Sequence, residues 1–385
     1  MTANLGEIFA NGQIYLLLYA FFALTMLIEG FYENVTVSRW MARGSALILI
    51  LFVGLRWDTG TDWRAYFNIF YATQSNPDYD IIVFGVDPGY VLINHLVYSF
   101  FDDYSVFLLL DALIAIAAVY VFIEKSTRLP NMGVYLFYTS YVLTHFMGSN
   151  RRMLAIGFVC LGFLFMLRPA RLWQGWWRWV APFALAASVH RTSVLALPGL
   201  VVSRRAWPVA LVVPGLLTCV GLGMSGAPFA ALEALGSLLS SFAHITVIDK
   251  LLFYTSGGGE AQVAGELDVM RQALLGVAKR STVLAVFIFY MIKGELDEYE
   301  QRLYNIYVTG CAIYFLMIGS PIFQVVSTYY TIVEIVLMPI LFSKTPQFKV
   351  PYTLYLLIVP LALMISALTP YMELYVPYRS IFTTY

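Results

Sequence analysis

Long apolar runs separated by short polar turns dominate the chain. Several runs reach the roughly 20 residues that a helix needs to cross a bilayer core of about 30 Å. None alternates apolar and polar residues with a period of two, as the strands of a barrel would, so the pattern predicts membrane-spanning helices. The predicted spans lie at 12–33, 43–56, 104–123, 132–148, 150–167, 207–224, 275–292, 303–319, 322–343 and 351–369.

Two further apolar segments do not fit a simple span. Segment 88–101 is too short to cross, and segment 179–202 is interrupted by the polar residues 188–193. Short or interrupted apolar segments are tolerated at membrane depth where they line a cavity, so we expect both to be re-entrant and to lie at a functional site. The expected fold is all-α, with about 10–12 transmembrane or re-entrant helices in one integral-membrane domain spanning residues 1–385.

Composition agrees with a polytopic membrane protein. The chain is 60% hydrophobic and 12% charged, whereas soluble domains carry about 25% charged residues. The formal net charge of zero argues against a nucleic-acid partner. Cys160, Cys219 and Cys311 lie inside apolar runs, and no metal-ligand spacing is present, so we expect neither a metal nor a cofactor.

The basic residues of the short loops predict the orientation, because cytoplasmic loops carry an excess of lysine and arginine. These loops contain Arg39, Arg43, Lys125, Arg128, Arg168, Arg171, Arg178, Arg204, Arg205, Lys293, Arg302, Lys344 and Lys349. Successive loops lie on alternate sides of the membrane only if all of these basic loops are cytoplasmic and segment 88–101 is re-entrant. Both termini, a loop at 57–103 that holds the re-entrant helix, and a loop at 225–274 then face the other side, which in a bacterium is the periplasm.

Basic residues on the predicted periplasmic side go against this rule. They are Arg56, Arg64, Arg151, Arg152, Arg191, Lys250, Arg271, Lys279, Arg280 and Arg379. Charges kept at a membrane rim against the topological preference are paired with acidic residues or held for an anionic ligand. Both interpretations remain open at this point.

Charged and aromatic residues concentrate in the stretch from Leu55 to Asn94. Asp62 follows Gly60-Thr61, and Asp87 precedes Pro88-Gly89, so each aspartate is placed where a helix begins. An Asp beside arginines at such a position is expected to have a lowered pKa. The alternative interpretation is two well-capped helices with no further role.

Four helices are predicted to begin on the same face, at Asp62, Asp87, Asn150 and His190. Helix N-termini present unpaired N–H groups and a positive dipole end, so their convergence with arginines predicts an anion site suited to a phosphate or pyrophosphate. His190 is a candidate base, a candidate phosphate donor, or a histidine satisfied by the backbone.

The loop at 225–274 contains an amphipathic stretch, Phe229–Leu239, followed by a triple glycine at 257–259 and an acidic run. It is a candidate lid on the membrane surface. The triple glycine is weak evidence for a phosphate-binding loop, because no strand precedes it and no Gly-Lys-Ser/Thr follows it.

Several short motifs occur in an order that resembles the EpsG-type, Wzy-like polymerases of bacterial exopolysaccharides and O-antigens. The motifs are Arg56 with Gly60-Thr61-Asp62 and Tyr66, then Asp87-Pro88-Gly89-Tyr90 with Asn94, then Arg151 with Ala155, then His190-Arg191-Thr192-Ser193, and finally Tyr375-Val376-Pro377-Tyr378. The family usually has Glu at the position of Asp87, Gln at that of Arg152, and an arginine ahead of Tyr329-Tyr330. Here Gln324 to Thr328 lacks that arginine, and Arg271 or Arg280 would supply its phosphate contact.

The resemblance implies a GT-C-like, metal-independent glycosyltransferase of the inner membrane. It would join undecaprenyl-pyrophosphate-linked repeat units at the periplasmic face, beside a chain-length regulator and a flippase of the same pathway, among membrane lipids. The implied catalytic residues are Asp62, with Asp87 and His190 as alternatives. The implied substrate-binding residues are Arg56, Asp58, Thr61, Tyr66, Tyr90, Asn94, Arg151, Arg152, Arg191, Arg271 and Arg280.

Three other functions share parts of this pattern. A lipid-linked oligosaccharide flippase would need charges along a path through both leaflets, whereas here they gather on one side. A glycan O-acyltransferase would need its histidine near a cytoplasmic acyl donor, and His190 falls on the other side. A ligase that moves finished glycan to another acceptor would use the same chemistry as the polymerase.

Overall fold

The computed structural model describes residues 2–32, 34–72, 85–167, 175–202, 207–240, 252, 269–293, 295–318 and 320–383. Within these ranges the chain is helical, apart from turns and one isolated antiparallel bridge between Arg56 and Ser380. The all-α prediction is confirmed. The structure divides into two compact units, Met1–Leu197 with Glu334–Tyr385, and Pro198–Val333.

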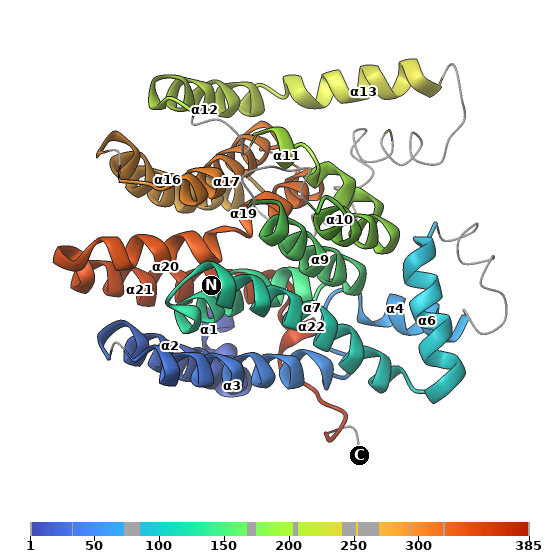
Figure 1. Cartoon of the computed structure of the whole chain (residues 1–385). Coiled ribbons are helices and arrows are strands. Elements are labelled where there is room, and N and C mark those ends of the chain that lie inside the picture. Colours follow the sequence, from blue (N-terminus) through green and yellow to red (C-terminus); the bar gives the residue numbers. More distant parts are fainter. Residues whose placement is uncertain are drawn as a thin grey trace. The chain divides into compact units, whose positions relative to one another are not determined.

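The first unit contains the N-terminal half of the chain and its C-terminal helices (Figure 1). Its helices are α1 (Thr2–Asn11), α2 (Gln13–Phe31), α3 (Val35–Gly54), α4 (Trp63–Ala72), α6 (Pro88–Phe101), α7 (Tyr104–Ser126), α8 (Pro130–Phe137), η1 (Tyr138–Phe146), α9 (Asn150–Leu167), α10 (Trp177–Val189), η2 (Arg191–Ala196), α20 (Glu334–Lys344), η4 (Pro346–Phe348), α21 (Lys349–Leu368), η5 (Thr369–Tyr371) and α22 (Met372–Tyr375).

Helices α3, α7 and α9 form the centre of this unit and pack closely through small residues. A Cβ atom on Gly54 of α3 would lie 2.9 Å from Leu109 Cα of α7, and one on Gly157 of α9 would lie 2.8 Å from the Ala115 carbonyl oxygen. Small residues allow helix backbones to approach in a membrane, where packing rather than water exclusion drives association. The central helices are therefore fixed in register by steric fit.

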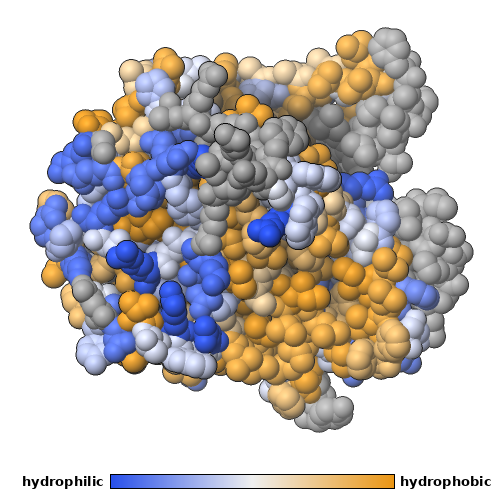
Figure 2. All heavy atoms as spheres, in the orientation of Figure 1, coloured by the Kyte–Doolittle hydropathy of each residue, from blue (hydrophilic) through white to orange (hydrophobic). Residues whose placement is uncertain are grey.

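In the part of the chain that the structure describes, six helices are long and apolar enough to cross a membrane, or up to eight if each bent pair is one span. Their outer surfaces carry exposed hydrophobic side chains such as Leu17 on α2, Leu47 on α3 and Leu113 on α7. Figure 2 shows a broad continuous hydrophobic area on one face, with charged and polar side chains gathered at its side. Such a surface suits lipid contact, so the chain is a multi-pass membrane protein.

The two segments that do not fit a simple span are a short helix and a broken helix in the structure. Helix α6 begins at Pro88 and ends at Phe101, as the apolar run predicts, and has only 14 residues. The other segment breaks at His190, which separates α10 from the 3₁₀ helix η2. The polar residues at 188–193 end α10, and this break places His190 and Arg191 outside regular α-helix.

The second unit contains α11 (Gly199–Val202), α12 (Val209–Met224), α13 (Ala227–Ser240), α16 (Val269–Lys293), α17 (Glu298–Leu316), α18 (Pro321–Gln324), η3 (Val325–Ser327) and α19 (Thr328–Thr331). Asp297 and Glu300 form a reciprocal capping box that begins α17. The amphipathic stretch at 229–239 is helical, within α13, and α13 is bent by 68° from α12. The triple glycine at 257–259 lies outside the described residues.

Candidate functional site

Three helices of the first unit begin around the carboxylate of Asp87. Asp87 is the N-cap residue of α6, Arg151 is in the first turn of α9, and His190 and Arg191 begin η2. The sequence predicted helix starts at these places and at Asp62, directly before α4, and the structure confirms all four. We call Asp87, Arg151, His190 and Arg191 the Asp87 cluster.

The Asp87 carboxylate is almost fully buried and accepts several contacts. Its Oδ2 atom lies 3.1 Å from Arg151 Nη1 and 3.6 Å from His190 Nδ1. Its Oδ1 atom lies 3.1 Å from Arg191 Nε and accepts a 3.3 Å hydrogen bond from the Arg191 backbone N–H. One carboxylate therefore holds two guanidinium groups and an imidazole in a fixed arrangement.

Close backbone packing brings α6 to this position. A Cβ atom on Gly89 would lie 2.4 Å from Ser188 Oγ and 2.9 Å from the Ser188 carbonyl carbon, near the end of α10. A larger residue at 89 would push α6 away from α10 and separate Asp87 from His190. The Asp87-Pro88-Gly89 motif thus supplies the cap, the first helical residue and the close approach.

The charges of the cluster affect one another. Burial raises the pKa of Asp87, but the hydrogen bond with His190 and the charge of Arg151 outweigh burial, so its pKa lies below the ordinary value. Burial lowers the pKa of His190, and the charges of Arg151 and Arg152 lower it further against the opposing effect of Asp87. At neutral pH, Asp87 is therefore ionised and His190 is neutral.

Asp62 differs from Asp87 in its electrostatics. Its carboxylate is half-buried, and burial raises its pKa although Arg152 and Arg151 oppose the rise. The expectation of a lowered pKa was wrong, because desolvation exceeds the effect of the two arginines. Among the described residues, Asp62 forms no ion pair within 4.0 Å, so its carboxylate is a better proton acceptor than that of Asp87.

The backbone at Gly60 and Thr61 places Asp62 beside the start of α9. Gly60 has φ +115°, and a Cβ atom there would lie 2.1 Å from the Met147 carbonyl oxygen, so glycine is required. Thr61 Oγ1 donates to the Gly148 carbonyl at 3.1 Å, and the Gly60 N–H donates to the Leu374 carbonyl at 2.9 Å. The C-terminal segment thus helps to hold the loop that carries Asp62.

Tyr66 links α4 to the cluster. Its hydroxyl lies 2.7 Å from Ser149 Oγ and accepts a 3.3 Å hydrogen bond from Arg151 Nε. Its ring packs edge-on against Tyr90 of α6 at 5.5 Å. Asn94, one turn further along α6, donates to the Tyr90 carbonyl at 2.7 Å and does not reach the cluster.

Arg56 lies behind the cluster and not at its surface. Its side chain is fully buried and donates to the Val53 carbonyl and, at 2.7 Å, to Asn150 Oδ1. Asn150 is the first residue of α9 and also donates to the Tyr104 hydroxyl at 3.3 Å. Arg56 therefore fixes the helix start that carries Arg151 and Arg152.

Asp58, another predicted substrate contact, lies at the outer rim. It has φ +40° and accepts two 3.0 Å hydrogen bonds from Arg64 and one of 3.3 Å from Arg379. The hydrogen bonds from Arg64 lower the pKa of Asp58. Asp58, Arg64 and Arg379 form a second, more exposed group of charges.

Two predicted contacts are not placed with the others. The side chain of Arg271 lies outside the described residues. Arg280 belongs to the second unit, where its guanidinium lies 3.5 Å from the centre of the Tyr314 ring and donates to the Gly276 carbonyl at 3.1 Å. Gln324 to Tyr330 also belongs to that unit.

Asp111 was missed by the sequence analysis. It lies on α7, is fully buried, interacts electrostatically with Arg56, and neither carboxylate oxygen has a hydrogen-bond partner among the described residues. A single aspartate inside an apolar span was the available signal, because intramembrane charges are expensive and functional by default. The buried side chains of Asp111 and Arg56 therefore interact across the centre of the first unit without forming a hydrogen bond to each other.

Among the described residues, no group of three or more His, Cys, Asp or Glu side chains could hold a metal ion. The described site instead gathers arginines, helix starts, aspartates and a neutral histidine. Such a site suits a phosphorylated substrate and a proton transfer. The fold and the site together define a multi-pass, all-helical membrane protein with a cationic site at the ends of its helices.

The family follows from the sequence match. Residues 39–380 match the model of the EpsG family, which is nearly the whole chain, so the chain belongs to this family. Membership confirms the predicted resemblance and gives the protein a polysaccharide-polymerase type of role, which is glycosyltransferase-like. No curated protein and no solved structure matches the chain.

Proposed function

We propose that this protein joins lipid-linked oligosaccharide repeat units into a polysaccharide. The observation that carries the proposal is the Asp87 cluster beside Asp62, where helix starts and arginines meet a carboxylate of raised pKa. A hydroxyl of the acceptor glycan attacks the anomeric carbon of the donor. The bond from that carbon to the lipid pyrophosphate breaks, and the pyrophosphate leaves as an anion.

The donor pyrophosphate binds at Arg151, Arg152 and Arg191. Arg151 and Arg191 are oriented by Asp87, and Arg152 Nε has no hydrogen-bond partner among the described residues. The N-termini of α6 and α9 add their dipoles near the place where negative charge develops. Neutral His190 is held by Asp87 on its Nδ1 side, which leaves Nε2 to contact the phosphate or the acceptor.

Asp62 takes the proton of the acceptor hydroxyl. Its raised pKa suits a general base better than the lowered pKa of Asp87, which is engaged by cations. Arg152 remains close enough to influence the Asp62 charge. The base and the pyrophosphate site therefore lie at adjacent helix starts.

The buried residues position these groups. Arg56 holds Asn150 at the start of α9, and Tyr66 holds the Arg151 guanidinium. We assign Arg56 a positioning role because its side chain is fully buried. Tyr66 and Tyr90 pack edge-on against each other and are both buried, so we assign them a positioning role as well.

We place the site on the periplasmic face of the bacterial inner membrane, with undecaprenyl-pyrophosphate-linked glycans as donor and acceptor. The support is the distribution of lysine and arginine. Arg128 and Lys349 lie at the ends of the helices opposite to the site, where cytoplasmic loops are expected.

The test is an intact-mass analysis of lipid-linked glycans from a strain without the gene. If the protein is the polymerase, single repeat units accumulate on the lipid and polymer disappears. The wild-type gene reverses both changes. A ligase would instead leave long lipid-linked polymer, which would contradict the proposal. A flippase would also leave single units, so their accessibility to a membrane-impermeant reagent in sealed cells is measured as well, and units that face only the cytoplasm would contradict the proposal.

A further inference from the structure

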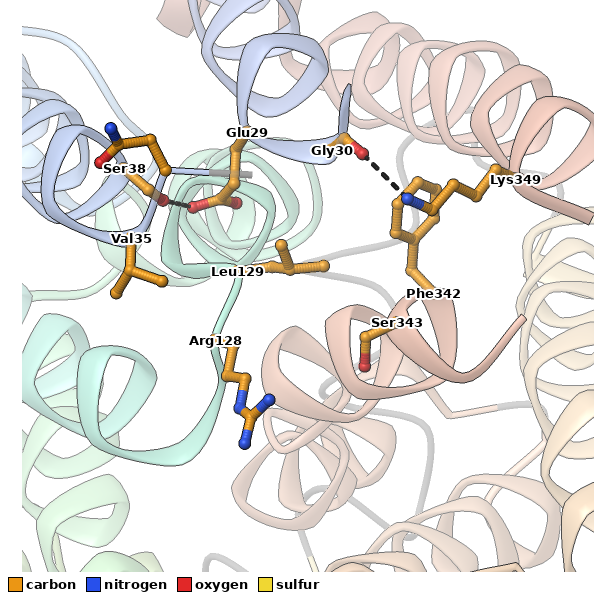
Figure 3. Close-up of a pocket in the computed structure, with 10 residues that line it drawn as sticks. Glu29, Gly30, Val35, Ser38, Arg128, Leu129, Phe342, Ser343 and Lys349 are labelled. Carbon is orange, nitrogen blue, oxygen red and sulfur yellow. Dashed lines mark hydrogen bonds between the residues drawn. The ribbon is translucent and has the colours of Figure 1, made fainter. Parts of the chain in front are cut away.

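A pocket of about 320 Å³ lies at the end of the first unit opposite to the Asp87 cluster. Figure 3 shows it where α2 ends, α3 begins, α8 begins, α20 ends and α21 begins. Its lining includes Glu29, Ser38, Arg128, Phe342, Ser343 and Lys349. All of these residues belong to one compact unit.

Two spanning helices connect this pocket to the candidate site. Helix α3 begins at Val35, which lines the pocket, and ends at Gly54, just before Arg56. Helix α7 begins at Tyr104, which contacts Asn150, and ends at Ser126, just before Arg128. At 1.5 Å per residue these helices are about 30 Å long, so the pocket and the site lie at opposite faces of the membrane core.

The acidic residue of the pocket is fully engaged. Glu29 is buried and accepts hydrogen bonds from Ser38 Oγ, from the Asn131 and Met132 backbone N–H groups at 2.9 and 2.8 Å, and from Asn131 Nδ2 at 2.8 Å. It thereby caps the start of α8. Both carboxylate oxygens of Glu29 are therefore engaged by donors of the protein.

Two cations line the pocket from different sides (Figure 3). Arg128 is exposed and forms no ion pair or hydrogen bond with another described residue. Lys349 donates to the Gly30 carbonyl at 3.4 Å and lies 6.0 Å from the Phe342 ring centre. An arginine and a lysine across a cavity suit one phosphate group, which the guanidinium binds as a fork and the ammonium as a point charge.

The surroundings indicate a lipid rather than a soluble phosphate. Val35, Phe348 and Val350 near the pocket are 53%, 53% and 64% exposed. In a spanning unit such side chains at a helix end contact acyl chains, while basic residues at the same level contact head groups. An amphipathic ligand satisfies both kinds of surface at once.

We propose that this pocket binds the phosphate head group of an anionic phospholipid, in the leaflet opposite to the candidate site. Arg128 and Lys349 bind the phosphate, and the apolar side chains around the pocket contact the acyl chains. The inference does not depend on the proposed function, because it uses only the pocket, its charges and its distance from the Asp87 cluster.

The experiment titrates the purified full-length protein with phosphatidylglycerol and counts bound lipids by native mass spectrometry. One lipid should bind the wild-type protein with a defined affinity, and phosphatidylcholine should bind about tenfold more weakly, because its head group has no net charge. The Arg128→Gln/Lys349→Gln protein should lose at least about tenfold in affinity for phosphatidylglycerol. The matched control is Arg39→Gln, which removes an exposed arginine of α3 that does not line the pocket.

A second variant guards against a folding defect in the first. Ser343→Trp keeps both cations but fills the pocket, so it should also lose the lipid while eluting as a single species in gel filtration. Unchanged phosphatidylglycerol affinity in both variants would overturn the proposal. Displacement of the lipid by millimolar inorganic phosphate would also overturn it, because the ligand would then be the free anion.

Discussion

Arg151 Nη1 and Asp87 Oδ2 lie 3.1 Å apart and join the first turn of α9 to the N-cap of α6. The pair is largely buried, with side-chain exposures of 23% and 6%. A partly buried arginine that keeps some exposure is both fixed by its acid and open to a ligand. This relationship makes the cluster a prepared anion site rather than a simple salt bridge.

Replacing Arg151 with lysine should impair polymer synthesis nearly as much as replacing it with alanine. The guanidinium contacts Asp87 through Nη1 and Tyr66 through Nε, and an ammonium group cannot make both contacts. The measurement is the rate of polymer formation by purified protein, where we expect a loss of about 100-fold or more. Arg64→Lys, at the exposed rim, is the control. A fully active Arg151→Lys protein would show that Arg151 only anchors the helix.

Replacing Arg152 with glutamine should move the acidic limb of the pH–rate profile to higher pH. Burial already raises the pKa of Asp62 above its ordinary value of 3.8, and Arg152 opposes this rise. A base works only when deprotonated, so activity falls as pH decreases through that pKa, and removing the opposing charge raises the pKa further. Arg64→Gln should leave the limb in place. If the acidic limb of the Arg152→Gln protein also stays in place, the pKa of Asp62 does not determine the pH dependence of the rate.

Replacing Arg56 with methionine should lower the free energy of unfolding by about 3 kcal/mol. The change removes the hydrogen bonds to Val53 and Asn150 and leaves the buried Asn150 side chain without this charged donor. The melting temperature of the purified protein in detergent measures the effect. Arg379→Gln, which breaks a half-exposed pair with Asp58, should cost no more than about 1 kcal/mol. Equal melting temperatures of Arg56→Met and Arg379→Gln would contradict the positioning role of Arg56.

The sequence predicted the positions of most helices because membrane spans are long and apolar, but the span predicted at 322–343 is broken into α18, η3, α19 and α20. The start of α9 at Asn150 and both ends of α6 follow from the run lengths and from Pro88 and the cap residues. The π-helix η1 was not predicted, because its residues are as apolar as those of an α-helix. The division into two compact units was not predicted either, because no change in composition marks the boundary between them along the sequence.

The candidate site was predicted in part. Proximity of Asp87, Arg151 and His190 followed from placing three helix starts on one face, and the structure brings them together. The opposite pKa shifts of Asp62 and Asp87 depend on burial and on distances between segments far apart in sequence, so local sequence did not reveal them. The burial of Arg56 and its partner Asp111 depend on the same packing.

Cysteine labelling should place the candidate site on the outer face of sealed cells. In a cysteine-free background, Asn68→Cys on the exposed side of α4 should react with a membrane-impermeant thiol reagent. Thr127→Cys, between α7 and α8, should react only after the cells are opened. Labelling of Thr127→Cys in sealed cells would reverse the proposed orientation.

The most direct measurement is polymer yield from purified Asp62→Asn protein supplied with lipid-linked repeat units. Asparagine begins a helix as well as aspartate does, but it does not accept the proton, so the account predicts a folded protein with a 10²–10⁴-fold loss of rate, the range typical of a lost base. Asp58→Asn, at the rim, is the matched control and should retain most activity. Wild-type polymerisation by folded Asp62→Asn protein would contradict the account.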